Sequence, residues 1–309
     1  MSSLILHHYA TSPFSEKVRL ILGAKNLAWQ SVTVPVMLPK PDVMALTGGY
    51  RRTPFLQIGA DIYCDTALMC QVIDRLAPTP PLYPAATRGL AEVVAQWADS
   101  ALFWIAVPYT LQPVSVPHMF PNAPPEFMKA FGADRAAMSP NLRRASVADG
   151  AAQLHAYLGR IENMLADGRA FLLGAESSIA DFSVAQSIWF IRRSPPIAAQ
   201  LEPYPQLVAW YERVNACGQG TASKMSAEAA IEIAASAGAH APTHIDAEAG
   251  FGEGEEVTVT PTDYAHDPVA GRLVGLTREA VTIARTDDRA GRVHVHFPRI
   301  GFQIKKVAA

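Results

Sequence analysis

Two short segments of this chain place polar side chains where a helix is expected to begin. In Ser12-Pro13-Phe14-Ser15, Ser12 suits the N-cap and Pro13 the first helical position. Asp65-Thr66 follows two short apolar runs, where the next helix must start. The free amides and the positive dipole end of a helix favour an anion at such a place. Both segments therefore predict binding sites for negative groups, and the Ser12 hydroxyl can donate a hydrogen bond to an anion such as a thiolate.

The residues between these segments supply the rest of a small polar pocket. Thr53-Pro54 opens a short apolar strand over residues 55–58, and a turn at residues 59–61 leads to a second strand that ends at residue 64. This hairpin brings its first and last residues close together. Backbone amides, the Asp65 carboxylate and the Thr66 hydroxyl then surround one pocket. Such a pocket suits a peptide-like ligand with an amino group and carboxylates.

The first 80 residues predict strands and helices in the order β-α-β, then β-β-α. Strands are expected at residues 4–6, 29–34, 55–58 and 61–64, and helices from residue 13 and over residues 65–76. Residues 35–52 contain several prolines and glycines, so we expect them to be irregular. Residues 1–80 are therefore expected to form one domain.

A proline-rich linker at residues 78–84 precedes a region of a different character. Apolar residues recur at helical spacing over residues 90–104, 154–165 and 207–214, and the alanine-rich residues 223–238 predict a last helix. Ser178-Ile179-Ala180-Asp181 is typical of a capping box at a helix start. Six prolines between residues 108 and 125 predict a long loop there rather than a helix. An all-helical domain is expected over residues 85–240.

The pattern changes again after about residue 245. Residues 256–260, 280–284 and 292–297 alternate between apolar and polar side chains, with turn residues between them. We expect a module of roughly five strands over residues 245–309, packed as a small antiparallel barrel or sandwich because closure hides the strand edges.

Composition excludes several classes of function. The formal net charge of −2 over 309 residues gives no attraction for nucleic acid or an anionic membrane. Three widely spaced cysteines do not suggest a disulfide framework and fit a reducing compartment. We expect neither a leader sequence nor an apolar run of about 18 residues, the length that spans a bilayer. These features predict a cytoplasmic protein.

Several motifs together resemble the glutathione transferase superfamily over residues 4–220. In chain order they are Ser12-Pro13-Phe14-Ser15 with the residues to Arg19, Thr53-Pro54 with Asp65-Thr66, Leu82-Tyr83-Pro84, Ser178-Ile179-Ala180-Asp181, and Tyr204-Pro205-Gln206-Leu207 with Trp210. The resemblance implies an α+β multidomain fold, with a thioredoxin-like N-terminal domain and an all-helical C-terminal domain. The β-rich extension lies outside the family pattern.

The resemblance implies that Ser12 is the catalytic residue. Ser12 and Ser15 occupy the places of the two cysteines in the Cys-Pro-x-Cys motif of glutaredoxin-like relatives, so thiol–disulfide exchange is excluded here. The Ser12 hydroxyl is expected to stabilise the glutathione thiolate, which is the nucleophile. Ser15 and Tyr9 remain alternatives, because some relatives use a tyrosine at the end of the first strand.

The resemblance also implies the residues that bind glutathione. Pro54 corresponds to the family's cis-proline, which turns the Thr53 backbone toward the cysteinyl backbone of the ligand. Thr66 suits the γ-glutamyl carboxylate and Asp65 its ammonium group, although Asp65 is shorter than the usual glutamate. Arg52 is expected to pair with the glycyl carboxylate.

A few other residues are assigned more modest roles. Arg51 is expected to be a solvated charge, and Asp181 to be structural. Tyr9, Trp104 and Tyr109 are candidates to line the pocket of a hydrophobic second substrate.

We expect no metal site. His294 and His296 point to the same strand face, but no third ligand with useful spacing is visible. Glutathione, as a co-substrate, is the one expected small-molecule partner besides the electrophile.

The function predicted from the sequence is attack of an activated glutathione thiol on a hydrophobic electrophile, with detoxification as its purpose and a homodimer as its assembly. A glutathione-dependent isomerase, dehalogenase or peroxidase is an alternative at the same site. A second hypothesis is a non-catalytic scaffold whose β-rich module binds a protein partner.

Overall fold

The N-terminal part folds as the sequence predicts. The structure is a computed structural model that describes residues 3–248 and 250–307. Its first elements are β1 (Ile5–His8), α1 (Pro13–Ala24), β2 (Ala28–Thr33), β3 (Phe55–Ile58), β4 (Asp61–Cys64) and α3 (Thr66–Leu76). Strands β1 and β2 are parallel, and β3 runs antiparallel to both β1 and β4. This is the predicted thioredoxin-like arrangement.

One element in this part was not predicted. Helix α2 (Pro41–Thr47) forms within the segment that we expected to be irregular. Pro41 occupies its first turn, where a missing backbone N–H costs nothing. Gly48 ends the helix with a φ of 74°, a conformation that glycine adopts without strain.

The helical domain contains more helix than expected. Its main helices are α4 (Arg88–Trp97), α5 (Phe103–Thr110), α8 (Val147–Met164), α9 (Ile179–Arg192) and α11 (Pro205–Asn215), with the π-helical stretch Ala98–Leu102 between α4 and α5. The predicted loop is wrong, because α6 (Val116–Met119) and α7 (Pro125–Met138) form there. The prolines of these two helices lie in their first turns, where they are compatible with helix.

Asp181 has the structural role that the sequence predicted. Its carboxylate accepts hydrogen bonds from the backbone N–H of Ser178 and Leu172, both at 2.8 Å, and from Trp210 Nε1 at 2.8 Å. The first of these belongs to the capping box of α9. Asp181 therefore fixes the start of α9 against α11.

One continuous helical segment of the domain is both long and apolar. The helix over Arg88–Thr110 is long and apolar enough by length and composition to cross a membrane, a test that helices within folded domains also pass. Within the fold, its Asp99 forms an ion pair with Lys17 of α1 and it packs against α9. The segment therefore lies inside the helical domain.

The chain then returns to the N-terminal sheet. Residues 221–224 form strand β5 (Thr221–Lys224) rather than helix, and β5 pairs in parallel with β2. Helix α12 (Ala227–Ser236) follows and contacts α2, β2 and β9 (Gly291–Pro298). A strand thus occurs within the range that we expected to be all helical.

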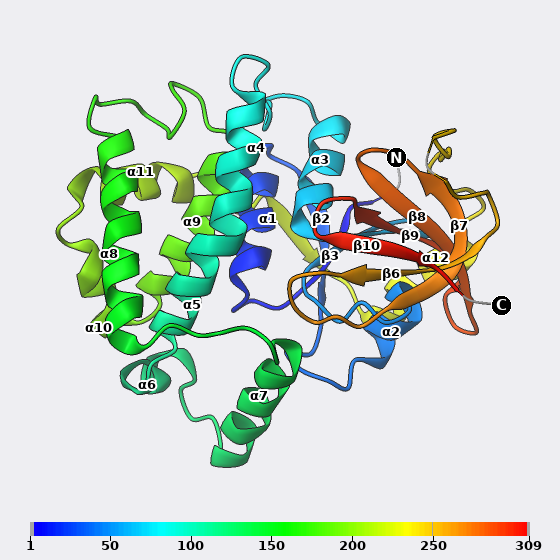
Figure 1. The fold of residues 1–309 in the computed structure, drawn as a ribbon, viewed down its shortest axis with the longest axis horizontal. Coiled ribbons are helices and arrows are strands. Elements are labelled where there is room, and N and C mark those ends of the chain that lie inside the picture. The colour runs from blue at the N-terminus through cyan, green and yellow to red at the C-terminus, as the bar shows by residue number, and fades with distance from the viewer. Residues whose placement is uncertain (1–2, 249, 308–309) are drawn as a thin grey trace.

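The C-terminal module consists of five antiparallel strands, as predicted. They are β6 (Glu256–Pro261), β7 (Val269–Leu276), β8 (Ala280–Asp287), β9 and β10 (Phe302–Lys306). Figure 1 shows β10 folding back in front of β8 and β9, and the rings of Phe297 and Phe302 lie 5.4 Å apart. The module is therefore a curled, barrel-like sheet.

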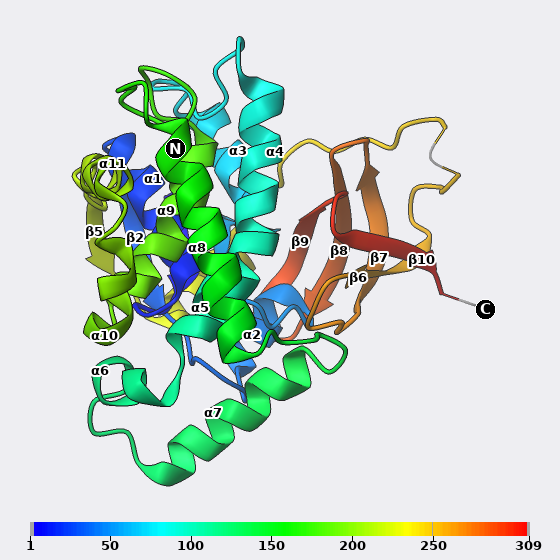
Figure 2. The ribbon, with the colours of Figure 1, turned by 60° about the vertical axis from the view of Figure 1, so that its left-hand side comes forward.

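The module is not a separate unit. Strand β9 pairs in parallel with β4, so the described strands form one ten-stranded sheet in the order β10-β6-β7-β8-β9-β4-β3-β1-β2-β5. Figures 1 and 2 show the helical domain on one side of this sheet's N-terminal part and the module on the other. Phe55, Ile62 and Cys64 share one buried cluster with module residues such as Val295 and Phe297. The module therefore completes the core of the N-terminal domain.

Candidate active site: a basic and aromatic pocket

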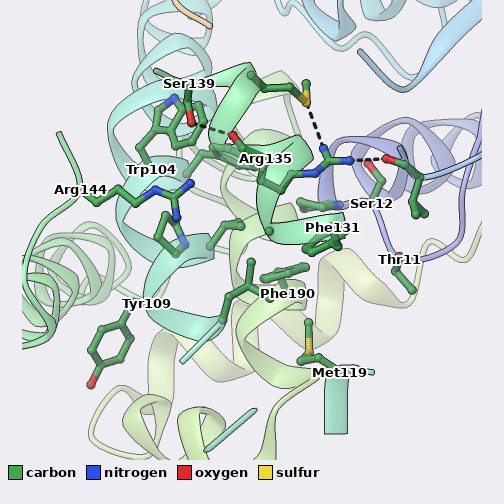
Figure 3. Close-up of a pocket in the computed structure, with 18 of the residues that line it drawn as sticks. Thr11, Ser12, Trp104, Tyr109, Met119, Phe131, Arg135, Ser139, Arg144 and Phe190 are labelled. Atoms are coloured by element: carbon green, nitrogen blue, oxygen red, sulfur yellow. Dashed lines mark hydrogen bonds between the residues drawn. The ribbon is translucent and has the colours of Figure 1, made fainter. Parts of the chain in front are cut away.

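A pocket of about 650 Å³ lies between the N-terminal domain, helices α5 to α8 and the loop between β6 and β7. Figure 3 shows its side chains, with Ser12 and Arg135 near one end and Trp104, Tyr109 and Phe190 along the helical side. Of the predicted site residues, six line the pocket: Tyr9, Ser12, Arg52, Thr53, Trp104 and Tyr109. Ser15, Pro54, Asp65 and Thr66 are not among its lining residues.

Ser12 is positioned at the N-terminus of α1. Its Oγ accepts a hydrogen bond from the backbone N–H of Ser15 at 3.2 Å, which makes it the N-cap. The Ser12 hydroxyl also lies beside the Tyr9 hydroxyl, and both residues line the pocket. Ser15 is fully buried, and within the described part of the chain its Oγ has no hydrogen-bond partner. The geometry therefore favours Ser12 over Ser15 as a donor to a ligand.

Tyr9 lies just beyond β1 and also lines the pocket. Burial raises the pKa of its hydroxyl above the ordinary value, partly offset by the positive charge of Arg135. The phenol is therefore protonated at neutral pH. It remains available as a hydrogen-bond donor near Ser12.

The segment before β3 has the backbone form that the family resemblance implied. The Thr53–Pro54 peptide is cis. Lys40 donates from Nζ to Thr53 Oγ1 and to the Arg51 carbonyl, both at 3.1 Å. Lys40 therefore fixes the conformation of this segment at the pocket wall.

Asp65 and Thr66 lie next to this segment. The register pairs Phe55 with Cys64, so Pro54 and Asp65 are the adjacent residues outside the hairpin. Asp65 has a φ of 70° and caps α3 by accepting from the Ala67 N–H at 2.9 Å. Thr66 is the first residue of α3 and is buried. A carboxylate bound there would meet the free amides of the α3 N-terminus.

A buried cation lies beneath Thr66. Lys17 Nζ is 3.5 Å from Thr66 Oγ1 and 2.6 Å from Asp99 Oδ2, and the lysine is fully buried. Burial opposes the charge of Lys17, but Asp99 outweighs it and raises the pKa of the lysine. Gln186 also donates to Asp99, at 2.6 Å. This ion pair joins α1 to the helical domain and adds positive potential beneath α3.

Cationic side chains line much of the polar part of the pocket, and three of them are paired with carboxylates: Arg51 and Arg135 with Asp134, and Arg52 with Asp263. Among the residues that the structure describes, five cationic side chains and no carboxylate line it: Lys40, Arg51, Arg52, Arg135 and Arg144. Arg51 is not the solvated charge that we expected, because it is only 9% exposed and forms an ion pair with Asp134 of α7. Arg135 of α7 donates to the Val36 carbonyl. The lining suits a ligand with more than one negative group.

Arg52 is engaged by the C-terminal module. Its guanidinium forms an ion pair with Asp263, donates to the Tyr264 carbonyl and lies 3.7 Å from the centroid of the Tyr264 ring. Tyr264 in turn packs edge-on against Trp104, with ring centroids 5.2 Å apart. Within the described residues, Arg52 Nε has no partner. A glycyl carboxylate at Arg52 would therefore use Nε or compete with Asp263.

The other side of the pocket is aromatic. Phe103 and Trp104 of α5 contact each other edge to face, and Phe103 packs on Phe14 of α1. Phe120, Phe127 and Phe131 form a second aromatic group, and the further apolar residues are Met119, Met128, Met138 and Phe190. This side suits an apolar molecule.

Sequence reasoning missed several of these residues. Phe127, Phe131 and Arg135 belong to α7, which was predicted to be a loop. Lys40 lies in the segment that was expected to be irregular, and Tyr264 belongs to the extension, whose position no local pattern reveals. The proline at position 125, which suits the first turn of a helix, was the one signal for α7.

A cluster of three possible metal ligands, which the sequence did not reveal, lies elsewhere in the fold; whether it binds a metal is untested, so the expectation of no metal site stays a prediction. Asp61, His240 and His294 each place a ligand atom within 4.8 Å of the others. They come from β4, from the connection after α12 and from β9, so their spacing in the sequence gives no indication of the cluster.

A thioredoxin-like sheet, a helical domain and a serine N-cap at the pocket define the class of protein. The glutathione S-transferase N-terminal domain matches residues 6–81, and the glutathione S-transferase C-terminal domain matches residues 144–213. The structure of a GST-like protein from Pseudomonas syringae is 43% identical, with a TM-score of 0.83, and covers 99% of this chain and 100% of that chain. The chain belongs to the glutathione S-transferase superfamily. Because the match extends over nearly the whole chain, the C-terminal module has a counterpart in that structure.

Two curated proteins are more distant relatives. FtsZ-localized protein A of Caulobacter vibrioides is 26% identical over 188 residues, which are 58% of this chain and 73% of that protein. Pyrimidodiazepine synthase of Drosophila melanogaster is 28% identical over 85 residues, which are 26% of this chain. The chain spans about a third of the length of that synthase, 35%.

Proposed function

We propose that this protein is a glutathione transferase-like enzyme that activates the glutathione thiol for attack on a hydrophobic electrophile. The observation that carries the proposal is the pocket itself, whose lining combines the Ser12 hydroxyl, five cationic side chains and many aromatic rings. Glutathione bears two carboxylates and one thiol. The polar part of the lining therefore suits glutathione, and the apolar part suits a hydrophobic electrophile.

In this proposal Ser12 stabilises the thiolate. Its Oγ accepts from the Ser15 N–H, so its own hydrogen points to the bound sulfur, and the N-terminus of α1 adds positive potential. Both effects favour the charged form and lower the thiol pKa. The thiolate sulfur then forms a bond to the electrophilic carbon. In a substitution the bond from that carbon to the leaving group breaks and its electron pair departs with that group, whereas in an addition the pair moves onto the electrophile, which takes a proton from water.

The remaining predicted residues hold the tripeptide. The Thr53 backbone pairs with the cysteinyl residue, and the Thr66 amide and hydroxyl bind the γ-glutamyl carboxylate, with Lys17 beneath them. Asp65 receives the ammonium group. Arg52 reaches the glycyl carboxylate through Nε or by exchange with Asp263. Because the ligand is held in this way, it loses its translational and rotational entropy when it binds. That cost then does not add to the barrier of the chemical step.

The experiment is glutathione-dependent turnover of a broad panel of electrophiles, followed with wild type and Ser12→Ala. The panel includes substrates for conjugation, dehalogenation, isomerisation and peroxide reduction, because the same activated thiol serves each of these reactions. Turnover that requires both glutathione and Ser12 supports the proposal. Turnover that is unchanged in Ser12→Ala contradicts the role of Ser12.

A second candidate function is a scaffold that binds a protein partner. The relation to FtsZ-localized protein A and the engagement of Arg52 by Asp263 favour it. In this case the glutathione site is weak or lost, and the C-terminal module presents the surface for the partner. A wild-type protein that neither binds glutathione nor turns over any electrophile leaves this function as the better one.

We propose a homodimer in the cytoplasm, with detoxification as the physiological role. Leu90 and Val93 on α4 and Leu76 on α3 are more than half exposed, which suits a surface covered by a second subunit. Sedimentation equilibrium tests the assembly. Val93→Glu is expected to shift the protein toward monomer.

A further inference from the structure

A cluster of histidines and one carboxylate lies where the C-terminal module joins the N-terminal domain. Asp61 begins β4, His294 lies in β9, and the parallel register pairs these two residues directly. His240 reaches the same place from the connection that follows α12, and its ring stacks on His294 with centroids 3.6 Å apart. Three segments that are distant in sequence therefore meet at one point, and none of these three residues lines the basic and aromatic pocket.

The histidines of this cluster lack the partners that buried polar groups normally have. His294 is 7% exposed, and within the described residues neither of its ring nitrogens has a hydrogen-bond partner. The same holds for His240 Nδ1. A buried polar atom without a partner costs stability, and native folds rarely retain several in one place. These nitrogens therefore point to a ligand that would pair with them.

The carboxylate is already held in position. His296 donates from Nε2 to Asp61 Oδ1 at 2.7 Å, and the Ala241 backbone N–H donates to Oδ2 at 2.8 Å. The Thr282 hydroxyl donates to His296 Nδ1 at 2.9 Å, which fixes the tautomer of that ring. Outer hydrogen bonds of this kind orient carboxylate ligands in metal sites. Asp61 keeps a free lone pair toward His240 and His294.

We propose that Asp61, His240 and His294 bind one divalent transition-metal ion, of which Zn²⁺ is the suitable test case. Two imidazoles and one carboxylate are a common three-residue donor set for Zn²⁺ and related ions, with a fourth position for water. The ligand atoms lie within 4.8 Å of one another. Bonds of about 2.0–2.2 Å require closer approach, and the stacked rings of His240 and His294 must rotate out of their parallel arrangement to direct their lone pairs at one ion.

Two electrostatic features bear on this site. Burial lowers the pKa of His294 to about 4, so at neutral pH its ring has the uncharged form that a metal needs. Arg292 opposes a cation, because its charge also lowers the pKa of His240 and His294. The Asp61 carboxylate is the compensating charge. The ion would connect β4, β9 and the connection after α12, and so attach the module to the N-terminal domain.

The test uses the full chain, stripped with a chelator and titrated with Zn²⁺ and with Co²⁺. We expect one equivalent of Zn²⁺, visible bands of low-symmetry Co²⁺, and a higher melting temperature with Zn²⁺. His240→Ala is the main variant, because His240 lies outside the strands and its loss leaves the sheet intact. His244→Ala is the matched control, since His244 is four residues away and mostly exposed, beside Asp246.

The expected result is at least a tenfold weaker Zn²⁺ affinity for His240→Ala and an unchanged affinity for His244→Ala. His296→Gln is expected to weaken binding by roughly 10- to 100-fold, the usual effect of removing an outer partner. The proposal is overturned if the wild type takes up less than one equivalent, or if His240→Ala and His244→Ala bind equally well.

Discussion

The Ser12→Ala substitution removes one hydroxyl from the start of α1 and tests the proposed chemistry at a single atom. In the structure Ser12 Oγ accepts from the Ser15 N–H, and the hydroxyl lies beside that of Tyr9 at the pocket. The substitution therefore has two separable effects. It removes a helix cap, and it removes the proposed donor to the glutathione thiolate.

The size of each effect follows from these contacts. A lost N-cap costs about 1 kcal/mol of stability. A hydrogen bond to a charged group contributes about 1.5–3 kcal/mol. At 1.36 kcal/mol for each pKa unit, its loss raises the pKa of bound glutathione by roughly 1–2 units. At a pH below the thiol pKa of both proteins, the thiolate fraction is then about 10- to 100-fold lower in Ser12→Ala than in wild type. The value of kcat/KM is expected to fall by the same factor.

The assay is an ultraviolet titration of the bound thiolate, together with kcat/KM measured against pH. Ser12→Thr keeps a hydroxyl and a cap, so it is expected to retain most of the activity. Ser15→Ala is the matched control, because Ser15 is buried and lies outside the pocket lining. A thiol pKa that does not move in Ser12→Ala, or that moves equally in Ser15→Ala, refutes the assignment.

Four further outcomes are expected. Phe297→Ala removes a fully buried ring that contacts the core beneath the module, and urea unfolding is expected to show a loss of about 3–5 kcal/mol; a loss below 1 kcal/mol contradicts the shared core. Asp99→Leu leaves buried Lys17 without a partner and is expected to cost about 3–5 kcal/mol, whereas Asp99→Leu with Lys17→Met is expected to recover most of it; equal losses in the two proteins argue against the ion pair. Tyr264→Ala removes the ring between Arg52 and Trp104, so kcat/KM for bulky electrophiles is expected to rise; a uniform fall for all substrates contradicts a covering role. Burial and nearby Arg135 lower the pKa of Lys40 to about 8, so affinity for carboxylate ligands is expected to decline as pH rises through 8 in wild type but not in Lys40→Met.

The lowered pKa of Lys40 also makes the free energy of unfolding depend on pH. Between pH 8 and the ordinary lysine value of 10.5, the unfolded chain binds the proton that folded Lys40 has lost. The contribution of Lys40 to the free energy of unfolding therefore rises with pH across that window. Guanidinium unfolding of wild type and Lys40→Met at pH 7.5 and 10 measures the difference. A wild-type stability advantage that shrinks over this range contradicts the assigned pKa.

The elements that local patterns specify were predicted well. A capping residue marks the start of α1 and of α3, and apolar periodicity marks α8 and α11; each forms near its expected range. The capping box at Ser178 depends on residues three apart and was equally clear. Alternation and turn residues were sufficient to predict five strands after residue 245.

Helix α7 was missed for a local reason, because prolines near position 125 indicate a helix start as readily as a loop.

The long-range arrangement of the elements was not predictable from local patterns. The pairing of β4 with β9 joins residues more than 230 positions apart, and neither strand carries a mark of its partner. The position of the Tyr264 ring beside Arg52 depends on that pairing, and so does the cluster at Asp61. The family resemblance supplied Ser12 and Thr66, whereas the module's contribution to the pocket required the structure.

Calorimetric titration of glutathione tests the central claim, that the tripeptide binds with its cysteinyl part at Ser12 and Thr53 in the pocket and its γ-glutamyl carboxylate at Thr66 beside it. The proteins are wild type, Thr66→Val and the control Thr87→Val, in which a threonine at the start of α4 makes no capping hydrogen bond through its side chain. We predict that wild type and Thr87→Val bind with a Kd of about 1 mM or tighter, equivalent to about −4 kcal/mol, and that Thr66→Val binds at least several-fold more weakly. No detectable binding to wild type at ten times that concentration, or equal binding to all three proteins, would contradict the account.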